Sequence, residues 1–304
     1  MVTDSPRVSV GMPVYNGAPY IKEAIDSILS QSFDDLELII SDNASTDATE
    51  GICRACAALD PRVRYVRNAR NLGASDNYNA VCRLSTGQYF KWASSNDLCA
   101  ESFILDCAEI LDRHSEVVLC YPRTKLFATG VAQAIEYEDE LDLKSENPVA
   151  RFFCVYSRMR LNNIMNGLIR AAVLTKTPLI KSFFSSDVCL MAELALYGKF
   201  YEVPKYLFFR RMDVNTATKL KNEVEVLRHY DPDLKDPMLF QNWKLLAGYF
   251  AAGWRAPLSL SQRMQMLGLQ ARMLAWSRRS LLDDLRVATK ELPTRQPKET
   301  TRRI

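Results

Sequence analysis

The first part of the chain alternates short apolar runs with segments of helical periodicity. In residues 20–29 apolar side chains recur every three or four positions, which predicts a helix with one apolar face. Strands joined by helices of this length need crossover connections, so the pattern predicts an α/β fold with a mostly parallel central sheet. The apolar runs that we interpret as strands lie at 8–14, 36–40, 63–67, 89–93 and 117–121, with further helices between 44 and 62, at 75–84 and at 101–113.

The middle of the chain, residues 123–215, follows this pattern less closely. It contains, in order, an acidic stretch, a helical pattern, a strand-like run and a second helical pattern, at 136–142, 149–158, 166–170 and 187–197. Ser185 and Ser186 are good N-cap residues for the last of these helices.

From about residue 216 the apolar pattern predicts helices only, followed by a polar tail from Pro293. We therefore expect an α/β domain over residues 1–215 and a helical C-terminal region over 216–304. Within the α/β domain the change of pattern at about residue 122 separates two halves.

The bulk composition is that of a globular protein, with 48% hydrophobic and 25% charged residues in 304. A net charge of +3 is too small to argue for nucleic acid as a partner. No apolar run reaches the roughly 18–20 residues that cross a bilayer, and the first residues lack the plan of a signal peptide. These features predict a cytoplasmic protein.

Eight cysteines agree with a reducing compartment, since several lie inside predicted helices or strands. Cys53 and Cys56 have the spacing of a zinc or redox pair. A zinc site would need a second pair of ligands at suitable spacing, which the sequence does not offer. We therefore expect both thiols to pack inside a helix.

Polar residues gather where the predicted strands end. The run at 89–93 ends in Ser94-Ser95-Asn96-Asp97, and the run at 36–40 is followed by Asp42. Ligands of parallel α/β sheets collect at the carboxyl ends of the strands, so these positions are candidates for chemistry. The glycine patterns of dinucleotide-binding and P-loop sites are absent from the sequence.

Each candidate also has a structural interpretation. Asp97 could help to hold Mg²⁺ or Mn²⁺, which prefer oxygen ligands, or it could cap the helix predicted from 101. Asp42 could accept hydrogen bonds from a nucleobase, whereas Asp47 in the same segment is more typical of a helix cap. Asp187 could act as a general base, or it could stabilise the start of its helix through the helix dipole.

Several of these segments together resemble family 2 glycosyltransferases with the GT-A fold. The opening "VSVGMPVYNGAPYIKEAIDSILSQSF" is similar to theirs nearly residue for residue, and Asp42 begins an Asp-x-x-Ser-x-Asp segment of the family type. The resemblance covers roughly residues 6–213. It implies a nucleotide-binding half and an acceptor-binding half that share one sheet. It also implies sugar transfer from a nucleotide-diphosphate donor to an acceptor hydroxyl, with inversion at the anomeric carbon.

The resemblance also implies roles for individual residues. Asp187 would be the catalytic base, and Asp97 would hold a divalent metal, Mn²⁺ or Mg²⁺. The chain departs from the family where Ser94 replaces an acid and where Asp213 replaces a histidine, and Asp213 could serve as a second metal ligand. The nucleotide-sugar would be bound by Pro13, Tyr15, Asn16, Asp42, Arg70, Asn71, Ser95, Asn96 and Arg211.

Two other functions stay open at this stage. The missing acids are compatible with a degenerate nucleotide-sugar-binding or scaffold protein. A nucleotidyltransferase is a weaker alternative, because residues 13–17 lack the Gly-rich basic loop that it would need.

The C-terminal helices combine large apolar residues with arginines, as at Arg272, Arg278 and Arg279. Such helices could pack on the catalytic domain, contact a second copy of the chain, or lie on the inner face of an anionic membrane. The expected partners are the donor and a glycan or lipid-linked acceptor.

Overall fold

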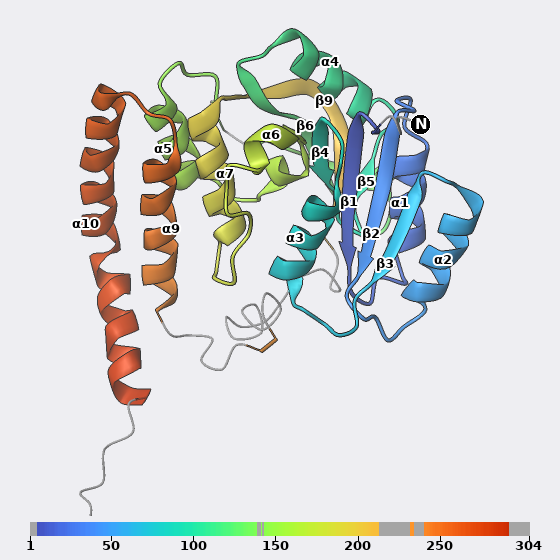
Figure 1. Cartoon of the computed structure of the whole chain (residues 1–304), viewed down its shortest axis with the longest axis horizontal. Helices are drawn as coiled ribbons and strands as arrows, with labels where there is room; N and C mark the ends of the chain where they lie inside the picture. The colour runs from blue at the N-terminus through green and yellow to red at the C-terminus, as the bar shows by residue number, and fades with distance from the viewer. Residues whose placement is uncertain (1–4, 139–140, 142, 213–231, 234–239, 292–304) are drawn as a thin grey trace, which may run out of the picture.

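The computed structural model describes residues 5–138, 141, 143–212, 232–233 and 240–291, which form one α/β body extended by two C-terminal helices (Figure 1). Its strands make a nine-stranded sheet in the order β3-β2-β1-β4-β8-β6-β9-β5, with β7 paired to β6. The strands are β1 (Val8–Val14), β2 (Leu36–Asp42), β3 (Val63–Arg67), β4 (Tyr89–Trp92), β5 (Leu98–Cys99), β6 (Val117–Phe127), β7 (Ile135–Tyr137), β8 (Leu168–Arg170) and β9 (Lys199–Arg211).

The N-terminal half follows the predicted alternation. Strands β3, β2, β1 and β4 run parallel and are connected by helices α1 (Ile21–Leu29), α2 (Thr49–Leu59) and α3 (Ala74–Leu84). Helix α3 packs closely on β1, because a Cβ added to Gly11 would come within 2.7 Å of Val81. The predicted α/β fold with a mostly parallel sheet is confirmed.

The second half continues the same sheet. Strand β8 lies antiparallel between β4 and β6, and β9 runs parallel to β6. Helices α4 (Phe103–Arg113), α5 (Pro148–Arg158), the short α6 (Ala171–Leu174) and α7 (Ser186–Tyr197) pack around these strands. Helix α7 is buried on nearly all sides, so it lies inside the core rather than on the surface.

Some elements differ from the sequence-based expectation. Strands β5, β7 and β9 were not predicted, and β6 runs to Phe127 instead of stopping near residue 121. Prolines at 122 and 204 and shifts of register between β6 and β9 break the alternation from which strands are read. The predicted cap of α7 is wrong in detail, because Ser185 has φ 57° and its side chain makes no cap hydrogen bond.

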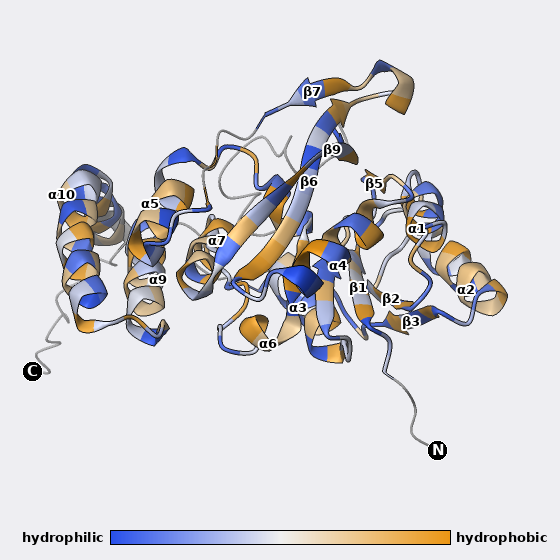
Figure 2. Cartoon of the chain, turned by 90° about the horizontal axis from the view of Figure 1, so that it is seen from above, coloured by the Kyte–Doolittle hydropathy of each residue, from blue (hydrophilic) through white to orange (hydrophobic). Residues whose placement is uncertain are grey.

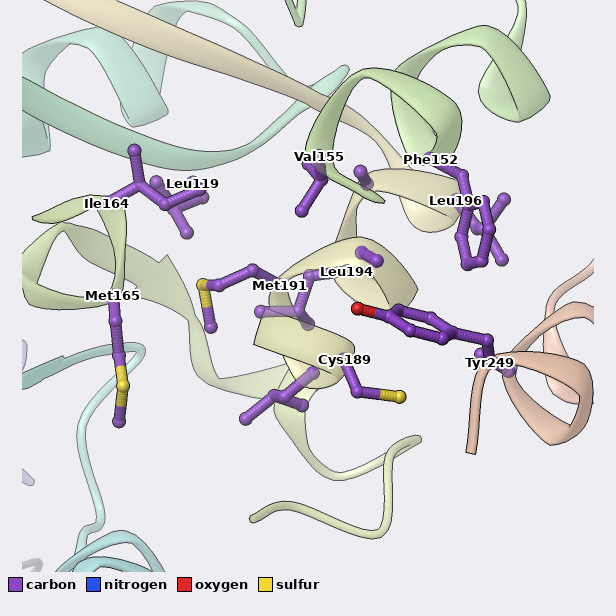
Figure 3. Close-up of a cluster of buried hydrophobic side chains, with 14 of the residues drawn as sticks. Leu119, Phe152, Val155, Ile164, Met165, Cys189, Met191, Leu194, Leu196 and Tyr249 are labelled. Carbon is purple, nitrogen blue, oxygen red and sulfur yellow. The ribbon is translucent and has the colours of Figure 1, made fainter. Parts of the chain in front are cut away.

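Two C-terminal helices extend the second half, as predicted for this part of the chain. Helix α9 (Gln241–Arg255) packs on α7, and α10 (Leu260–Glu291) packs on α9 and α5. Tyr249 of α9 points toward α7 beside Phe152 and Cys189, so α9 belongs to the main core (Figure 3). The predictions for residues 216–231, 234–239 and the tail from Pro293 lie outside the described residues.

None of the helices described here is both long and apolar enough to cross a membrane.

Candidate active site

The loops that follow β1 and β2 are fastened to each other at the carboxyl edge of the sheet. The backbone N–H of Asn16 donates to Ser45 Oγ at 2.9 Å, and Asn16 Oδ1 accepts from the N–H of Thr46 at 2.9 Å. Asn16 has φ 52°, a left-handed conformation that asparagine tolerates well. Pro13 is buried in β1, while Tyr15 is half exposed beside the fastened loops.

Asp42, the last residue of β2, has a fully buried side chain with three protein donors. Oδ1 accepts from the N–H of Ser45 at 2.8 Å, and Oδ2 accepts from Tyr65 Oη at 2.7 Å and Arg67 Nη1 at 2.9 Å. Burial alone would raise the pKa of Asp42, but the hydrogen bonds from Ser45 and Tyr65 and the charge of Arg67 together lower it. Asp42 is therefore held as an anion that also orders Arg67.

Asparagines form a second layer beneath these loops. Asn71 Oδ1 accepts from Asn43 Nδ2 at 2.8 Å and from the N–H of Gly73 at 2.8 Å. Asn77 accepts from Ser41 Oγ at 2.6 Å and donates to the carbonyl of Ser41 at 2.9 Å. The predicted binding residue Asn71 is thus used to fix the turn before α3. Arg70, its neighbour, is exposed and forms an ion pair with Asp233.

Asp97 lies between β4 and β5, and it does not cap α4, whose N-cap residue is Ser102. The capping interpretation of Asp97 is therefore wrong. Its Oδ1 accepts the backbone N–H of Arg211 at 2.8 Å, which ties the end of β4 to the end of β9. Burial raises the pKa of Asp97, while the Arg211 amide and the charge of Arg210 act in the opposite direction.

Arg211 fastens this corner instead of projecting into it. Its side chain is 5% exposed, donates through Nε to the carbonyl of Asn96 at 3.0 Å, and pairs with Glu23 at 2.9 Å. The guanidinium also lies over the rings of Tyr20 and Phe127, at 4.2 and 4.5 Å from their centroids. Arg211 is thus surrounded by protein groups, and its contact with the donor stays a prediction.

Tyr78 connects the two halves of the site. Burial raises the pKa of its phenol, and the negative charges of Asp97 and Asp187 raise it further, while a hydrogen bond with Ser94 and the charge of Arg210 oppose them. Both carboxylates therefore lie within electrostatic reach of one hydroxyl. Ser94 hydrogen-bonds Asp97 as well as Tyr78, so it bridges the two residues at the position where the family has an acid.

Asp187 is the second residue of α7 and is partly buried. Its Oδ2 accepts from Asn162 Nδ2 at 2.9 Å. Among the described residues Asn162 Oδ1 is buried and accepts no hydrogen bond, an arrangement that costs free energy in a folded protein. Asn162 was not predicted, because a lone asparagine in an irregular segment gives no sequence signal.

Lys91, in the middle of β4, was also missed. The side chain is fully buried, donates to the carbonyls of Trp92 and Asn166, and lies 4.3 Å from the ring centroid of Phe103. Burial lowers its pKa, and the negative charge of Asp97 counteracts this shift. A charged residue inside an aromatic run was read as part of an ordinary strand.

The remaining predicted residues are placed as follows. Ser95 and Asn96 are partly buried in the loop after β4, and a Cβ on Gly17 would lie 3.3 Å from Ser95 Oγ, so this loop adjoins the one after β1. Asp213 lies outside the described residues. Cys53 and Cys56 are buried free thiols in α2, and burial raises the pKa of Cys53 to about 12, as expected for inert packing.

The donor set around Asp97 fits a metal held by one carboxylate. Mg²⁺ is usually bound by one or two carboxylates together with substrate phosphates and water. Within the described residues no group of three or more His, Cys, Asp or Glu side chains converges on one point. Asp97, with the neutral oxygens of Ser94 and Asn96 near it in the loop, is compatible with that mode of binding.

A sheet with this strand order, with acids and amides gathered at its carboxyl edge, defines a GT-A nucleotide-sugar fold. The glycosyl transferase family 2 model matches residues 9–164, just over half of the chain. The chain therefore belongs to glycosyltransferase family 2, and it is a glycosyltransferase.

Curated relatives agree with this assignment. An uncharacterized glycosyltransferase of Haemophilus influenzae is 25% identical over 71% of this chain and 69% of its own length. The glycosyltransferase RP339 of Rickettsia prowazekii is 29% identical over 68% of this chain and 59% of its own length. The chain thus spans between about three fifths and two thirds of these relatives.

Solved structures share the fold. Staphylococcus aureus TarS 1–349 in complex with UDP-GlcNAc is 18% identical, with a TM-score of 0.64, covering 90% of this chain and 74% of its own. A mannosyltransferase from Pyrobaculum calidifontis, in complex with GDP-Man and Mn²⁺, is 18% identical, with a TM-score of 0.52 over 92% of this chain and 81% of its own.

Proposed function

We propose that this glycosyltransferase moves a sugar from a nucleotide-diphosphate donor to a hydroxyl of a glycan or lipid-linked acceptor, with inversion at the anomeric carbon. The observation that carries the proposal is the position of Tyr78 within electrostatic reach of both Asp97 and Asp187. One carboxylate comes from the nucleotide-binding half and the other from the acceptor half. A donor and an acceptor bound at these two groups would meet at one place.

The nucleotide would occupy the edge formed by the loops after β1, β2 and β3. Asp42, Asn16 and Asn71 keep these loops in fixed positions through hydrogen bonds to one another's backbones. A rigid edge lowers the entropy lost on binding. The complexes of TarS with UDP-GlcNAc and of the mannosyltransferase with GDP-Man support a nucleotide-sugar donor without deciding between the two bases.

Asp187 would act as the base in a direct displacement. Its carboxylate takes the proton of the acceptor hydroxyl while the oxygen forms a bond to the anomeric carbon. The bond between that carbon and the donor phosphate breaks in the same step, and the nucleoside diphosphate leaves with the bonding electrons. Attack from the face opposite the leaving group inverts the configuration.

Asn162 would position this base. The Nδ2–H donated to Asp187 Oδ2 at 2.9 Å leaves the other carboxylate oxygen to the acceptor. The buried Asn162 Oδ1 is an acceptor suited to a second hydroxyl of a sugar. An acceptor rich in hydroxyl groups, as a glycan is, fits both atoms.

The departing diphosphate would meet Arg210 and Asp97. Arg210 is partly buried, donates to Asn163 Oδ1 at 2.8 Å, and acts electrostatically on Asp97. A divalent cation, Mn²⁺ or Mg²⁺, held by Asp97 and the donor phosphates would neutralise the charge that develops on the leaving group. Asp213 stays a candidate for a further ligand.

Nucleotide titration tests this proposal directly. Calorimetry of the full chain with UDP, GDP and dTDP, each with and without Mn²⁺, should show one nucleotide binding more tightly when Mn²⁺ is present. Absence of binding to all three would favour the degenerate scaffold that the missing acid at Ser94 suggests. Binding that is equal with and without Mn²⁺ would remove the metal from the proposal and leave the donor site in place.

A further inference from the structure

Helix α10 carries an apolar stripe that is not packed on the rest of the described structure. The stripe has large side chains that are between 41 and 79% exposed. They recur every three or four residues, except that Arg278 occupies one position within the stripe, so they share one face of the helix. We call them the exposed stripe: Leu260, Met264, Leu267, Leu274, Leu282 and Leu285.

This stripe is distinct from the face that holds α10 in place. The packed face uses Met266, Leu269, Met273 and Leu281, which are nearly fully buried against the main core. The helix lies at one end of the molecule, beyond α5 and α9, in both Figure 1 and Figure 2. Its outer face is therefore open to a large flat partner.

A row of arginines borders the exposed stripe. Arg272, Arg279 and Arg286 are exposed and follow one another at intervals of seven residues, so they lie in line along the helix, about a quarter of a turn from the stripe. We call them the arginine row. Among the side chains described in α10 the acids are Asp283, which pairs with Arg286, and the buried Asp284. The open face is therefore apolar with a basic border.

A second copy of the chain fits this face poorly. In an antiparallel pair of α10 helices each flank meets the same flank of the partner, so one arginine row would face the other and like charges would repel. In a parallel pair the row would face the opposite flank of the stripe, which in each copy is turned toward α9 and α5. The charge pattern therefore favours an anionic partner over self-association.

We propose that the exposed stripe and the arginine row form a docking surface for an anionic lipid bilayer, on which α10 lies flat. A helix of this kind places its apolar side chains at the boundary between headgroups and acyl chains. Its arginines stay near the headgroups, where a negative surface potential attracts them. The enzyme would thereby be held at the surface where a lipid-linked acceptor resides.

Sedimentation of the full chain with vesicles tests this surface. The protein should bind vesicles of phosphatidylcholine mixed with phosphatidylglycerol, and it should bind phosphatidylcholine alone much more weakly. Binding should fall as salt is added, because screening weakens the attraction to the surface. Equal partition to both kinds of vesicle, or none to either, would overturn the proposal.

Two variants and matched controls locate the contact. Leu267→Glu/Leu274→Glu and Arg272→Glu/Arg279→Glu should each weaken binding to anionic vesicles at least about ten-fold. The controls make the same chemical changes at exposed positions elsewhere, as Leu59→Glu/Ile135→Glu and Arg83→Glu/Arg113→Glu. Unchanged binding in the α10 variants, or equal loss in the controls, would contradict the assignment of this surface.

Two further readouts separate this inference from the proposed function. Nucleotide binding, measured by calorimetry, should be the same in the α10 variants and in the unchanged chain, because α10 lies away from the nucleotide edge. Analytical ultracentrifugation identifies the competing occupant. A dimer that Leu267→Glu/Leu274→Glu dissociates, together with no preference for anionic vesicles, would assign the stripe to a second copy instead.

Discussion

At the scale of single residues, the site is built from polar groups that mostly hold one another. Asp42, Asn16, Asn71 and Arg211 each have protein partners that fix their orientation. Asp187 differs, because its printed partner is the amide of Asn162, which leaves carboxylate oxygen available for a substrate. The residues that order the site and the residues proposed to react are therefore different ones.

Replacing Asp187 with asparagine tests the base. Asp187→Asn keeps the shape of the side chain but removes the proton acceptor, so kcat should fall by at least about 100-fold. The affinity for the donor, measured by calorimetry, should stay near that of the unchanged protein. The matched control is Asp76→Asn, at an exposed acid in the first turn of α3. A fully active Asp187→Asn enzyme would remove Asp187 as the base.

Asn162→Asp tests whether the amide positions and tunes the base. A second carboxyl group beside Asp187 should raise the pKa of that acid through like-charge repulsion. The acid limb of the pH profile of kcat should then move to higher pH, while donor affinity stays unchanged. A purely structural role would lower activity or stability equally at every pH, with the limb in its original position.

Asp42→Asn tests the buried anion. The folded pKa of Asp42 is lowered, so its contribution to stability is present above the pKa of an unfolded aspartate, about 3.9, and is lost as pH falls through the folded pKa. The variant should be less stable at neutral pH by about 1–3 kcal/mol, with a smaller loss of stability on acidification. Urea unfolding at several pH values measures both. Nucleotide affinity should weaken as well, if Asp42 also contacts the base.

At the scale of elements, the end of β9 is the joint between the two halves of the sheet. Arg210 and Arg211 are neighbours in sequence but face different surroundings, since Arg211 is buried among Tyr20, Phe127 and Glu23 while Arg210 lies by Asn163 and acts on Asp97. Neighbouring side chains of a strand point to opposite faces, which explains the contrast.

The two arginines should therefore respond differently to substitution. Arg211→Met should lower the free energy of unfolding by about 1–3 kcal/mol, because the carbonyl of Asn96 loses its donor. Arg210→Met should leave stability closer to that of the unchanged protein and reduce kcat/KM. Thermal unfolding and steady-state kinetics distinguish them. The assignment is reversed if Arg211→Met stays stable but loses the donor.

At the scale of the whole molecule, the C-terminal helices belong to the same folded body as the catalytic part. Tyr249 of α9 packs edge-on against Phe152 and Tyr156, with ring centroids at 5.7 and 5.2 Å (Figure 3). Arg255, at the end of α9, forms two hydrogen bonds of 2.8 and 2.6 Å with Glu193, whose side chain is almost completely buried in α7.

This ion pair gives a prediction about folding. Arg255→Met should destabilise the protein by about 2–3 kcal/mol, because Glu193 is left buried without its partner. Glu193→Met/Arg255→Met should recover much of that loss, since an apolar pair can replace a buried ion pair. Urea unfolding of the two variants measures the coupling. Equal stability of both variants would show that the pair contributes little to the attachment of α9.

The sequence by itself determined the class of fold and the edge at which the chemistry lies. Helical and strand periodicities are local, so the alternation over residues 8–121 could be read directly, and strand ends with Asp42 and Asp97 predicted the site because parallel strands end on one edge. The family resemblance, which the comparison with family 2 confirms, rested on contiguous segments of the same kind.

The tertiary structure decided what each side chain contacts. Asn162 and Asp187 are 25 residues apart, and Arg211 and Asp97 are 114 apart, so no local pattern could pair them. Strand β9 was hidden because its prolines and register shifts disturb the alternation, although its pairing with β6 stabilises it. Packing likewise decided which apolar face of α10 is buried and which is open, because both faces have the same helical period in the sequence.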